Sequence, residues 1–149
     1  MNEKLKEMLE RHEGRRSEIY KDIKGIQTIG VGHNLVNSPL PPEMRTYLIG
    51  NGKITDEMID ELLEDDVVIA VKGCEKLYPD FYSMSENRQN GLTDFCFNVG
   101  YGTAKQFKKA NNAINSQNWS QAAIELKDSQ WAVQVKGRAT EVIKLIQEG

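Results

Sequence analysis

Two carboxylic acids and one hydroxyl group near the start of the chain could together do chemistry: Glu13, Asp22 and Thr28. One acid and one base or nucleophile, brought from different elements, are the side chains that cleavage of a glycosidic bond requires. Single carboxylates on a protein surface are mostly only solvated. The chemical interpretation therefore depends on the elements that position these three side chains.

The residues before Glu13 predict a helix that ends at this acid. Apolar residues recur with helical spacing over residues 3–12, Asn2 is a favourable N-cap, and Gly14 is a natural stop. Glu13 follows Leu9 by four residues, so its carboxyl is expected at the rim of the buried helix face. Desolvation at such a rim raises the pKa of a carboxyl group, which suits an acid that must carry a proton near neutral pH.

The residues after the helix predict a hairpin. Residues 18–22 and 26–32 are expected to form two short strands, joined by a turn in which Gly25 takes a left-handed conformation. The reversal after the helix would bring Asp22 back beside the helix end, with Thr28 near it across the hairpin. Spacing alone leaves a structural role for these side chains more favoured than a functional one.

The remaining pattern predicts an α+β fold with a small first lobe and an all-helical second lobe. The first lobe, with the hairpin, is expected over residues 1–55 and a long connecting helix over 56–78, with Thr55 as its N-cap. The helical lobe is expected over 79–149, and the whole chain 1–149 is expected to be a single domain.

Three local expectations accompany this outline. Residues 34–52 hold three prolines and are expected to form a loop with one helical turn at 43–49. Residues 53–54 are expected to form a short third strand. Ser83 and Glu86 resemble a capping box at the start of a helix.

Composition excludes several classes of function. The 149 residues carry a net charge of −3, and seven acids lie between Asp56 and Asp66 without a lysine or arginine, which does not favour nucleic-acid binding. No apolar run reaches membrane-spanning length and no signal peptide is recognised, so we expect no membrane insertion and a cytoplasmic site of synthesis. Cys74 and Cys96 lack metal-type spacing and are expected to be core residues.

One run of residues resembles the catalytic signature of phage-type lysozymes, glycoside hydrolase family 24, to which the endolysins of T-even phages belong. The run comprises Glu13-Gly14, Tyr20-Lys21-Asp22, Gly25 and Thr28 to His33. Further segments resemble the turn and linker helix, the cleft wall and the closing helices of that family: Asn51 to Thr55 with Asp66-Val67, Phe97 to Gly100 with Phe107, and Trp119 to Ala123 with Ser129, Trp131 and Arg138-Ala139. The resemblance implies a lysozyme-like fold over nearly the whole chain.

The resemblance implies roles for the first three residues. Glu13 would protonate the leaving glycosidic oxygen, Asp22 would orient or deprotonate a water molecule, and Thr28 would hydrogen-bond that water. Family members invert the anomeric centre, which predicts a carboxyl separation of about 6.5–9.5 Å. The implied substrate is bacterial peptidoglycan, cut at the β-1,4 bond between N-acetylmuramic acid and N-acetylglucosamine. No metal or cofactor is implied, and we expect a monomer.

His33 could be mistaken for a catalytic residue because histidine titrates near neutral pH. Asp66, however, falls on the apolar stripe of the connecting helix, where an unpaired carboxylate would be costly. A structural ion pair between His33 and Asp66, which the family resemblance also implies, is therefore the favoured interpretation. The resemblance also implies that Arg138 positions Glu13 from the helical lobe.

Substrate contacts are predicted at five further positions. Phe97 and Asn98 close a helix where the family lines its groove. At the positions that contact substrate in the T-even enzymes, this chain has different residues, and these are Asn34, Ala110 and Glu125.

Two other interpretations stay open. The chain could be a catalytically weak wall-binding or structural module of a phage particle, although such a module has no need of Glu13, Asp22 and Thr28 together. It could also be a lytic transglycosylase, which the residues expected to hold water disfavour. An endolysin made in the host cytoplasm would reach the wall through a holin-type pore, through lysis or by delivery on a virion.

Overall fold

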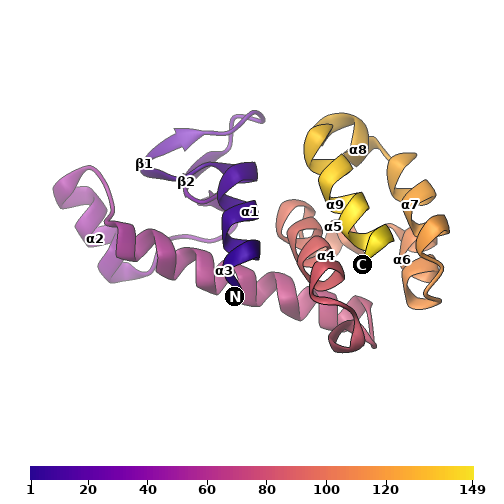
Figure 1. Cartoon of the computed structure of the whole chain (residues 1–149). Helices are drawn as coiled ribbons and strands as arrows, with labels where there is room; N and C mark the ends of the chain where they lie inside the picture. The colour runs from indigo at the N-terminus through magenta and orange to yellow at the C-terminus, as the bar shows by residue number, and fades with distance from the viewer. The chain divides into compact units, whose positions relative to one another are not determined.

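The computed structural model describes residues 1–149, which divide into two compact units, Met1–Asp66 and Val67–Gly149. The first unit holds a small antiparallel sheet, and the second is entirely helical (Figure 1). This confirms the predicted α+β class. Helix α3 (Asp56–Leu77) begins in the first unit and continues into the second.

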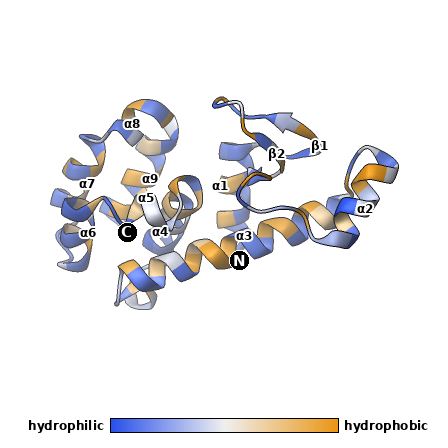
Figure 2. Ribbon diagram, turned by 180° about the vertical axis from the view of Figure 1, so that it is seen from behind, coloured by the Kyte–Doolittle hydropathy of each residue, from blue (hydrophilic) through white to orange (hydrophobic).

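The first unit contains, in chain order, α1 (Glu3–Glu13), β1 (Arg16–Lys21), β2 (Gln27–Gly30), β3 (His33–Asn34), α2 (Pro42–Asn51) and the start of α3. The sheet order is β1-β2-β3, and Tyr20 lies opposite Thr28 in the β1–β2 pair. Figure 2 colours α1 and α3 with alternating hydrophilic and hydrophobic segments, as amphipathic helices require. Leu5 and Leu9 on α1 and Ile59 on α3 are almost completely buried.

The second unit contains the end of α3, η1 (Phe81–Ser83), α4 (Glu86–Val99), α5 (Tyr101–Ala104), α6 (Lys108–Asn115), α7 (Trp119–Lys127), α8 (Gln130–Val135) and α9 (Gly137–Glu148). Its core surrounds Phe95, which makes edge-to-face contacts with both Phe107 and Trp131. Aromatic pairs of this kind prefer particular relative orientations, so they help to fix how the core packs as well as burying apolar surface.

Two local predictions in the first unit were wrong. Residues 42–51 form the full helix α2, because Pro42 stands in the first helical turn, where a missing N–H group costs nothing. The third strand is His33–Asn34, since the positive φ angles of Gly30 and Gly32 turn the chain back along β2. Residues 53–54 are not a strand, although the Ile54 amide donates to the Ser17 carbonyl at 2.9 Å.

The predicted capping box at Ser83 was also wrong. Ser83 ends the short 3-10 helix η1, and Ser85 caps α4 by accepting a hydrogen bond from the Arg88 amide at 3.2 Å. Both serines are favourable N-cap residues, and the N-cap is the one that immediately precedes the first helical turn.

Candidate active site

Glu13 is the last residue of α1 and is partly exposed. The helix begins at Asn2, whose side chain accepts a hydrogen bond from the Leu5 amide at 2.9 Å, as predicted. It ends at Gly14, where a φ of +78° reverses the chain while the amide donates to the Glu10 carbonyl. The helix is therefore capped at both ends, and Glu13 stands at its carboxyl terminus.

The backbone of Gly32 packs against the Glu13 carboxyl group. A Cβ atom added to Gly32 would lie 2.8 Å from Cδ of Glu13, and Gly32 has a φ of +64°. Both the backbone conformation and the space exclude a larger residue. The turn between β2 and β3 thus covers one side of the carboxyl group.

Arg15 fixes the reversal between α1 and β1. Its guanidinium donates to Oδ1 of Asp60 at 2.9 Å and to the Asp56 carbonyl at 3.1 Å. Burial alone would lower the pKa of Arg15, but the hydrogen bond and charge of Asp60 raise it, and the same hydrogen bond lowers the pKa of Asp60. The start of α3 therefore holds the segment that follows Glu13.

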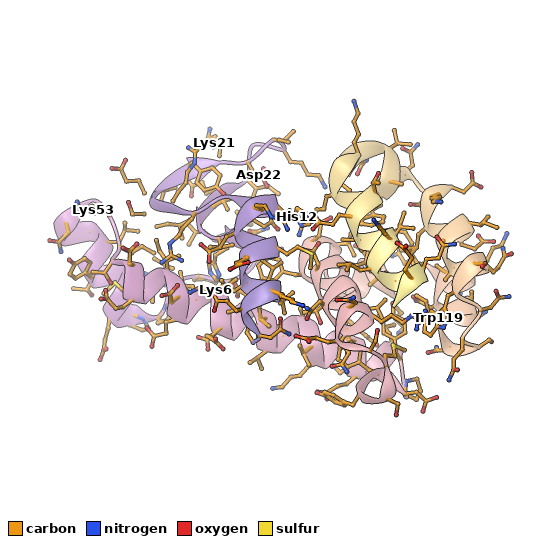
Figure 3. The ribbon with its side chains drawn as sticks, in the orientation of Figure 1. Lys6, His12, Lys21, Asp22, Lys53 and Trp119 are labelled. Atoms are coloured by element: carbon orange, nitrogen blue, oxygen red, sulfur yellow. The ribbon has the colours of Figure 1, made fainter.

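Asp22 lies in the turn that joins β1 to β2, labelled in Figure 3. Its Oδ1 accepts hydrogen bonds from the amides of Lys24 at 2.8 Å and Ile26 at 2.9 Å, and Gly25 takes the expected left-handed conformation with a φ of +80°. One carboxylate oxygen thus shapes the turn, while Oδ2 takes no part in these bonds.

Thr28 lies on β2 with only 4 % of its surface exposed. Its hydroxyl donates to the Ile26 carbonyl at 2.9 Å, so its single proton is engaged and its oxygen can still accept. Since Ile26 also donates to Asp22, one residue of the turn fixes both side chains.

Tyr20 responds to the charges of these side chains, and the sequence predicted no separate role for it. Burial raises the pKa of its phenol, the charges of Glu13 and Asp22 raise it further, and Arg16 opposes them. Glu13 and Asp22 therefore both lie within electrostatic range of one hydroxyl group. A signal was available, because Tyr20 precedes Asp22 by two residues and such residues share a face of a strand.

The chain is similar to several known proteins. The family described as "Phage lysozyme" matches residues 10–145. A protein named "Probable T4-type lysozyme 2" of Dictyostelium discoideum is 32% identical over 97% of this chain and 94% of its own length. The chain belongs to the phage lysozyme family. It is accordingly a glycoside hydrolase, as predicted.

Two phage proteins contain a similar region within a longer chain. The pre-baseplate central spike protein Gp5 of Enterobacteria phage T4 is 32% identical over 99% of this chain but only 28% of its own length. Peptidoglycan hydrolase gp36 of Pseudomonas phage phiKMV is 27% identical over 91% of this chain and 14% of its own length. The lysozyme region is thus found both nearly alone and as part of larger phage proteins.

His33 and Asp66 form the ion pair expected of a phage lysozyme. Nδ1 of His33 lies 2.7 Å from Oδ2 of Asp66, and Nε2 lies 2.7 Å from the Ser38 carbonyl. Burial alone would lower the pKa of His33, but the hydrogen bond and charge of Asp66 and the Ser38 carbonyl raise it. Both ring nitrogens face acceptors, so the doubly protonated ring is satisfied and His33 is fixed as part of the scaffold.

Asn34 is engaged in its own turn. Its Oδ1 accepts hydrogen bonds from the amides of Val36 at 2.9 Å and Asn37 at 3.0 Å. These bonds shape the segment after β3. Because they engage Oδ1, a substrate contact by Asn34 would have to use its side-chain amide nitrogen.

The other predicted site residues lie in the second unit. Asn98 accepts a hydrogen bond from Nε1 of Trp131 at 2.7 Å, and Phe97 packs partly buried against the core. Glu125 accepts from Nε2 of Gln121 at 3.0 Å. Ala110 is only 3 % exposed within the core, so its methyl group is covered by protein and does not favour the predicted substrate contact.

Arg138 also lies in the second unit, on α9. Its Nε donates to Oδ1 of the fully buried Asp94 of α4 at 2.9 Å. This ion pair joins two helices of the core, and a role in positioning Glu13 stays a prediction.

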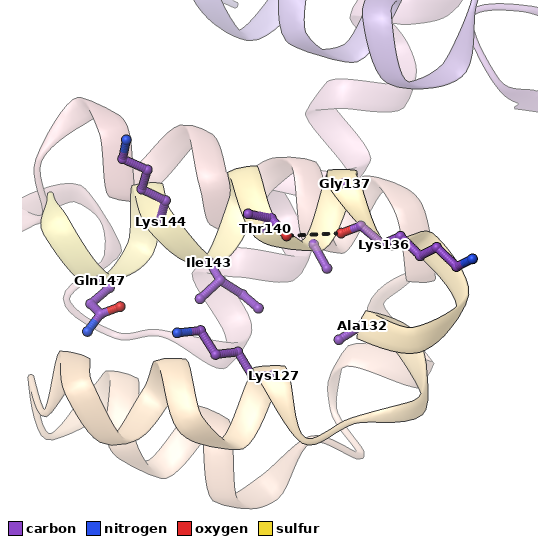
Figure 4. Close-up of a pocket in the computed structure, with 9 residues that line it drawn as sticks. Lys127, Ala132, Lys136, Gly137, Thr140, Ile143, Lys144 and Gln147 are labelled. Atoms are coloured by element: carbon purple, nitrogen blue, oxygen red, sulfur yellow. Dashed lines mark hydrogen bonds between the residues drawn. The ribbon is translucent and has the colours of Figure 1, made fainter.

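The second unit also contains a cavity of about 560 Å³ between α7, α8 and α9 (Figure 4). Ala139 and Ile143 contribute apolar surface, and Lys127, Lys136 and Lys144 line its edges. Figure 4 shows Lys136 and Lys144 extending away from each other. Because the ammonium groups do not converge, we assign no anion site to this cavity.

No group of three or more histidine, cysteine, aspartate or glutamate side chains is arranged to hold a metal ion. None of the helices combines the length and the apolar character needed to cross a bilayer.

Proposed function

We propose that the protein hydrolyses the β-1,4 bond between N-acetylmuramic acid and N-acetylglucosamine in bacterial peptidoglycan, with inversion at the anomeric carbon. Glu13 acts as the general acid, Asp22 as the general base and Thr28 as a water-holding residue. The observation that carries this proposal is the placing of the two carboxyls: that of Glu13 packs against the Gly32 backbone at the end of α1, and that of Asp22 is held in the β1–β2 turn through one oxygen only. Membership of the phage lysozyme family supports the same assignment.

The proposed role of Glu13 requires a protonated, neutral carboxyl group. The carboxyl terminus of a helix carries partial negative charge, which disfavours a carboxylate there. Contact with the Gly32 backbone removes water from one side of the group. An acid that keeps its proton near neutral pH can transfer it to the leaving glycosidic oxygen.

The positions of Asp22 and Thr28 favour the capture of one water molecule. Oδ2 of Asp22 and the oxygen of Thr28 can each accept a hydrogen bond from that water, because Oδ1 serves the turn and the Thr28 proton is engaged with Ile26. A water whose two protons are held in this way presents a lone pair to the anomeric carbon. Asp22 then takes a proton as the carbon–oxygen bond forms.

Inversion follows from this division of roles, because the attacking water needs room between the sugar and the base. We expect the Glu13 and Asp22 carboxyls to be separated by about 6.5–9.5 Å, against about 5–5.5 Å in a retaining enzyme. Asp22 would then never be a nucleophile, and no covalent glycosyl-enzyme intermediate would form.

We further propose that Phe97, Asn98 and Glu125 contact the glycan or its peptide stem. Phe97 and Asn98 are partly exposed and stand near the end of α4, and Glu125 is partly exposed on α7. The Trp131 indole fixes the Asn98 oxygen, so the amide nitrogen would be the group that donates to a sugar.

Delivery on a virion is a second candidate for the biological setting, beside release from the host cytoplasm through a pore or lysis. The observation that favours it is the similarity of this chain to a region of a phage spike protein. Infection with a phage that encodes Glu13→Gln would separate the two settings. Delayed lysis with normal adsorption indicates an endolysin, whereas impaired entry with normal lysis indicates a virion enzyme.

The decisive test of the chemistry is mass spectrometry of purified peptidoglycan digested by the wild type and by Glu13→Gln. Hydrolysis by the wild type gives free reducing muramic acid ends, and digestion in ¹⁸O-water followed by NMR of fresh products reports the anomeric configuration. Glu13→Gln should release almost no fragments. Anhydro-muramic ends would indicate a transglycosylase, and equal inactivity of both proteins on several wall types would indicate a binding module.

A further inference from the structure

The cavity between α7, α8 and α9 is an open groove whose charged lining is entirely positive. Lys127 of α7, Lys136 at the junction of α8 and α9, and Lys144 of α9 line it, and no aspartate or glutamate does. The whole chain, by contrast, carries a net charge of −3. This lysine groove is therefore a local positive region on an acidic protein.

The positive charge of the lysine groove is not neutralised from within the chain. The side chains of Lys127, Lys136 and Lys144 are exposed, and none of the three takes part in an ion pair of the protein. Glu125, the acid one turn before the end of α7, accepts a hydrogen bond from Gln121 and does not line the groove. The three ammonium groups can therefore attract an anionic ligand.

The spacing of the lysines favours an elongated ligand. Lys136, Thr140 and Lys144 recur every four residues, so they form one row along α9. At about 1.5 Å per residue this row is about 12 Å long. Figure 4 shows Lys136 and Lys144 at its two ends, and Lys127 beside Ile143 in the space between α7 and α9. A length of about 12 Å corresponds to about four residues of an extended peptide.

The surface between the lysines is largely apolar. Ala132, Ala139 and Ile143 line it, while Thr140 and Gln147 add polar groups that can donate and accept hydrogen bonds. An apolar floor accepts methyl groups, and the separated lysines accept carboxylates placed at intervals. The lysine groove thus matches a ligand in which small apolar side chains and carboxylates alternate.

We propose that the lysine groove binds the peptide stem of peptidoglycan, extended along α9 with its carboxylates toward the lysines and its alanine methyl groups on the apolar floor. The proposal rests on the proposed function, because that substrate brings such stems with it. None of the residues predicted to contact the glycan lines the groove. It is therefore an additional binding region, which raises the affinity for the wall and takes no part in the chemistry.

Other components of a bacterial wall fit the lysine groove less well. A glycan chain offers hydroxyl groups and leaves the lysines without an anionic partner. A phosphodiester polymer supplies anions at intervals but no methyl groups for the floor formed by Ala132, Ala139 and Ile143. The stem peptide uses both features of the lining.

The test is an NMR titration of the ¹⁵N-labelled protein, which needs no turnover. The probes are a synthetic N-acetylated stem tetrapeptide, the same peptide with its carboxylates amidated, and a glycerol-phosphate oligomer. The groove variant is Lys127→Gln/Lys144→Gln. Its matched control is Lys108→Gln/Lys109→Gln, which removes two exposed lysines of α6 that do not line the groove. All four lysines are exposed, and thermal unfolding confirms that both variants are folded.

We expect the tetrapeptide to shift the amide signals of Gly137, Thr140 and Ile143. The groove variant should weaken its binding about threefold to tenfold, and the control less than about twofold, because each exposed ion pair contributes little by itself. Added salt should weaken binding to the wild type, and amidation of the peptide should weaken it as well. On soluble peptidoglycan fragments, the groove variant should raise KM by a similar factor and leave kcat unchanged.

The proposal is overturned if the tetrapeptide leaves the groove signals unshifted, if the groove variant and its control bind it equally, or if KM stays at the wild-type value. Tighter binding of the glycerol-phosphate oligomer would assign the groove to a phosphate polymer and would overturn it too. Failure of the proposed function is seen separately, as hydrolysis of peptidoglycan by Glu13→Gln at the wild-type rate. The titration would still decide whether the groove binds the stem peptide.

Discussion

Asp22 and Asp66 belong to the same unit, yet their carboxyl oxygens are used differently. Asp66 binds a titratable partner directly, through a 2.7 Å contact with the buried His33 ring. Asp22 binds only backbone amides, and it does so through one oxygen. A carboxylate with a charged partner is committed to the scaffold, whereas one held by a single oxygen keeps a basic group available for chemistry.

The largest expected effect comes from Asp22→Asn, which removes the base and keeps the turn. An asparagine oxygen can still accept from the Lys24 and Ile26 amides, so the free energy of unfolding should change by less than about 0.5 kcal/mol. Turnover of peptidoglycan should fall about 10²- to 10⁴-fold. Reducing-end release and urea unfolding measure the two quantities, and activity within about tenfold of the wild type would contradict the role of Asp22 as base.

Asp66→Asn should give the opposite pattern. Removing this carboxylate leaves Nδ1 of the buried His33 without its acceptor, so the free energy of unfolding should fall by about 2–4 kcal/mol. Turnover at a temperature where the protein is folded should stay within about threefold of the wild type. Urea unfolding beside Glu64→Gln, which changes an exposed acid on the same helix, provides the control. A large loss of turnover with unchanged stability would place Asp66 in the chemistry.

The sequence predicted the structural features that depend on the local pattern of apolar and polar residues. The long periodic helices α1 and α3 were predicted with nearly the observed ends, and the pairing of His33 with Asp66 followed from one polar residue on an apolar stripe. Helix α2 was missed because its prolines indicate a loop unless their place in the first turn is known. Whether a proline starts a helix or lies in a loop depends on where the chain turns, and the composition of the segment does not specify that point.

Tyr20 and the two cysteines show what pattern cannot supply. Cys74 of α3 and Cys96 of α4 were correctly expected to be buried, but no sequence spacing indicated that their thiols meet. The neighbouring Cys96 thiol, together with burial, raises the pKa of the Cys74 thiol. Likewise, the link from Tyr20 to Glu13 arises only when a helix end and a strand approach each other in three dimensions.

Gly32→Ala should disturb the acid while leaving the Asp22 turn intact. The new methyl group would meet Cδ of Glu13 at 2.8 Å, in a backbone conformation that costs a non-glycine residue about 1–2 kcal/mol. Displacing the carboxyl group should lower kcat at least about tenfold. Gly52→Ala is the matched control, because Gly52 has a φ of +76° with nothing within 4 Å of an added Cβ. Equal kcat values for the two variants would show that Gly32 matters only for backbone conformation.

The smallest expected effect is the pH dependence that His33 gives to stability. Its pKa in the folded protein is raised above the unfolded value, which is about 6.5, so the folded state binds more protons than the unfolded state between these two values. This contribution is fully present below about pH 6.5 and is lost as the pH rises through the folded pKa. Urea unfolding from pH 5 to pH 9 should therefore show a decrease in this window. The decrease should be absent in Asp66→Asn and present in Asp22→Asn, since only Asp66 holds the imidazolium. If Asp22→Asn abolished this decrease instead, the assignment of Asp66 to the scaffold and Asp22 to the chemistry would be wrong.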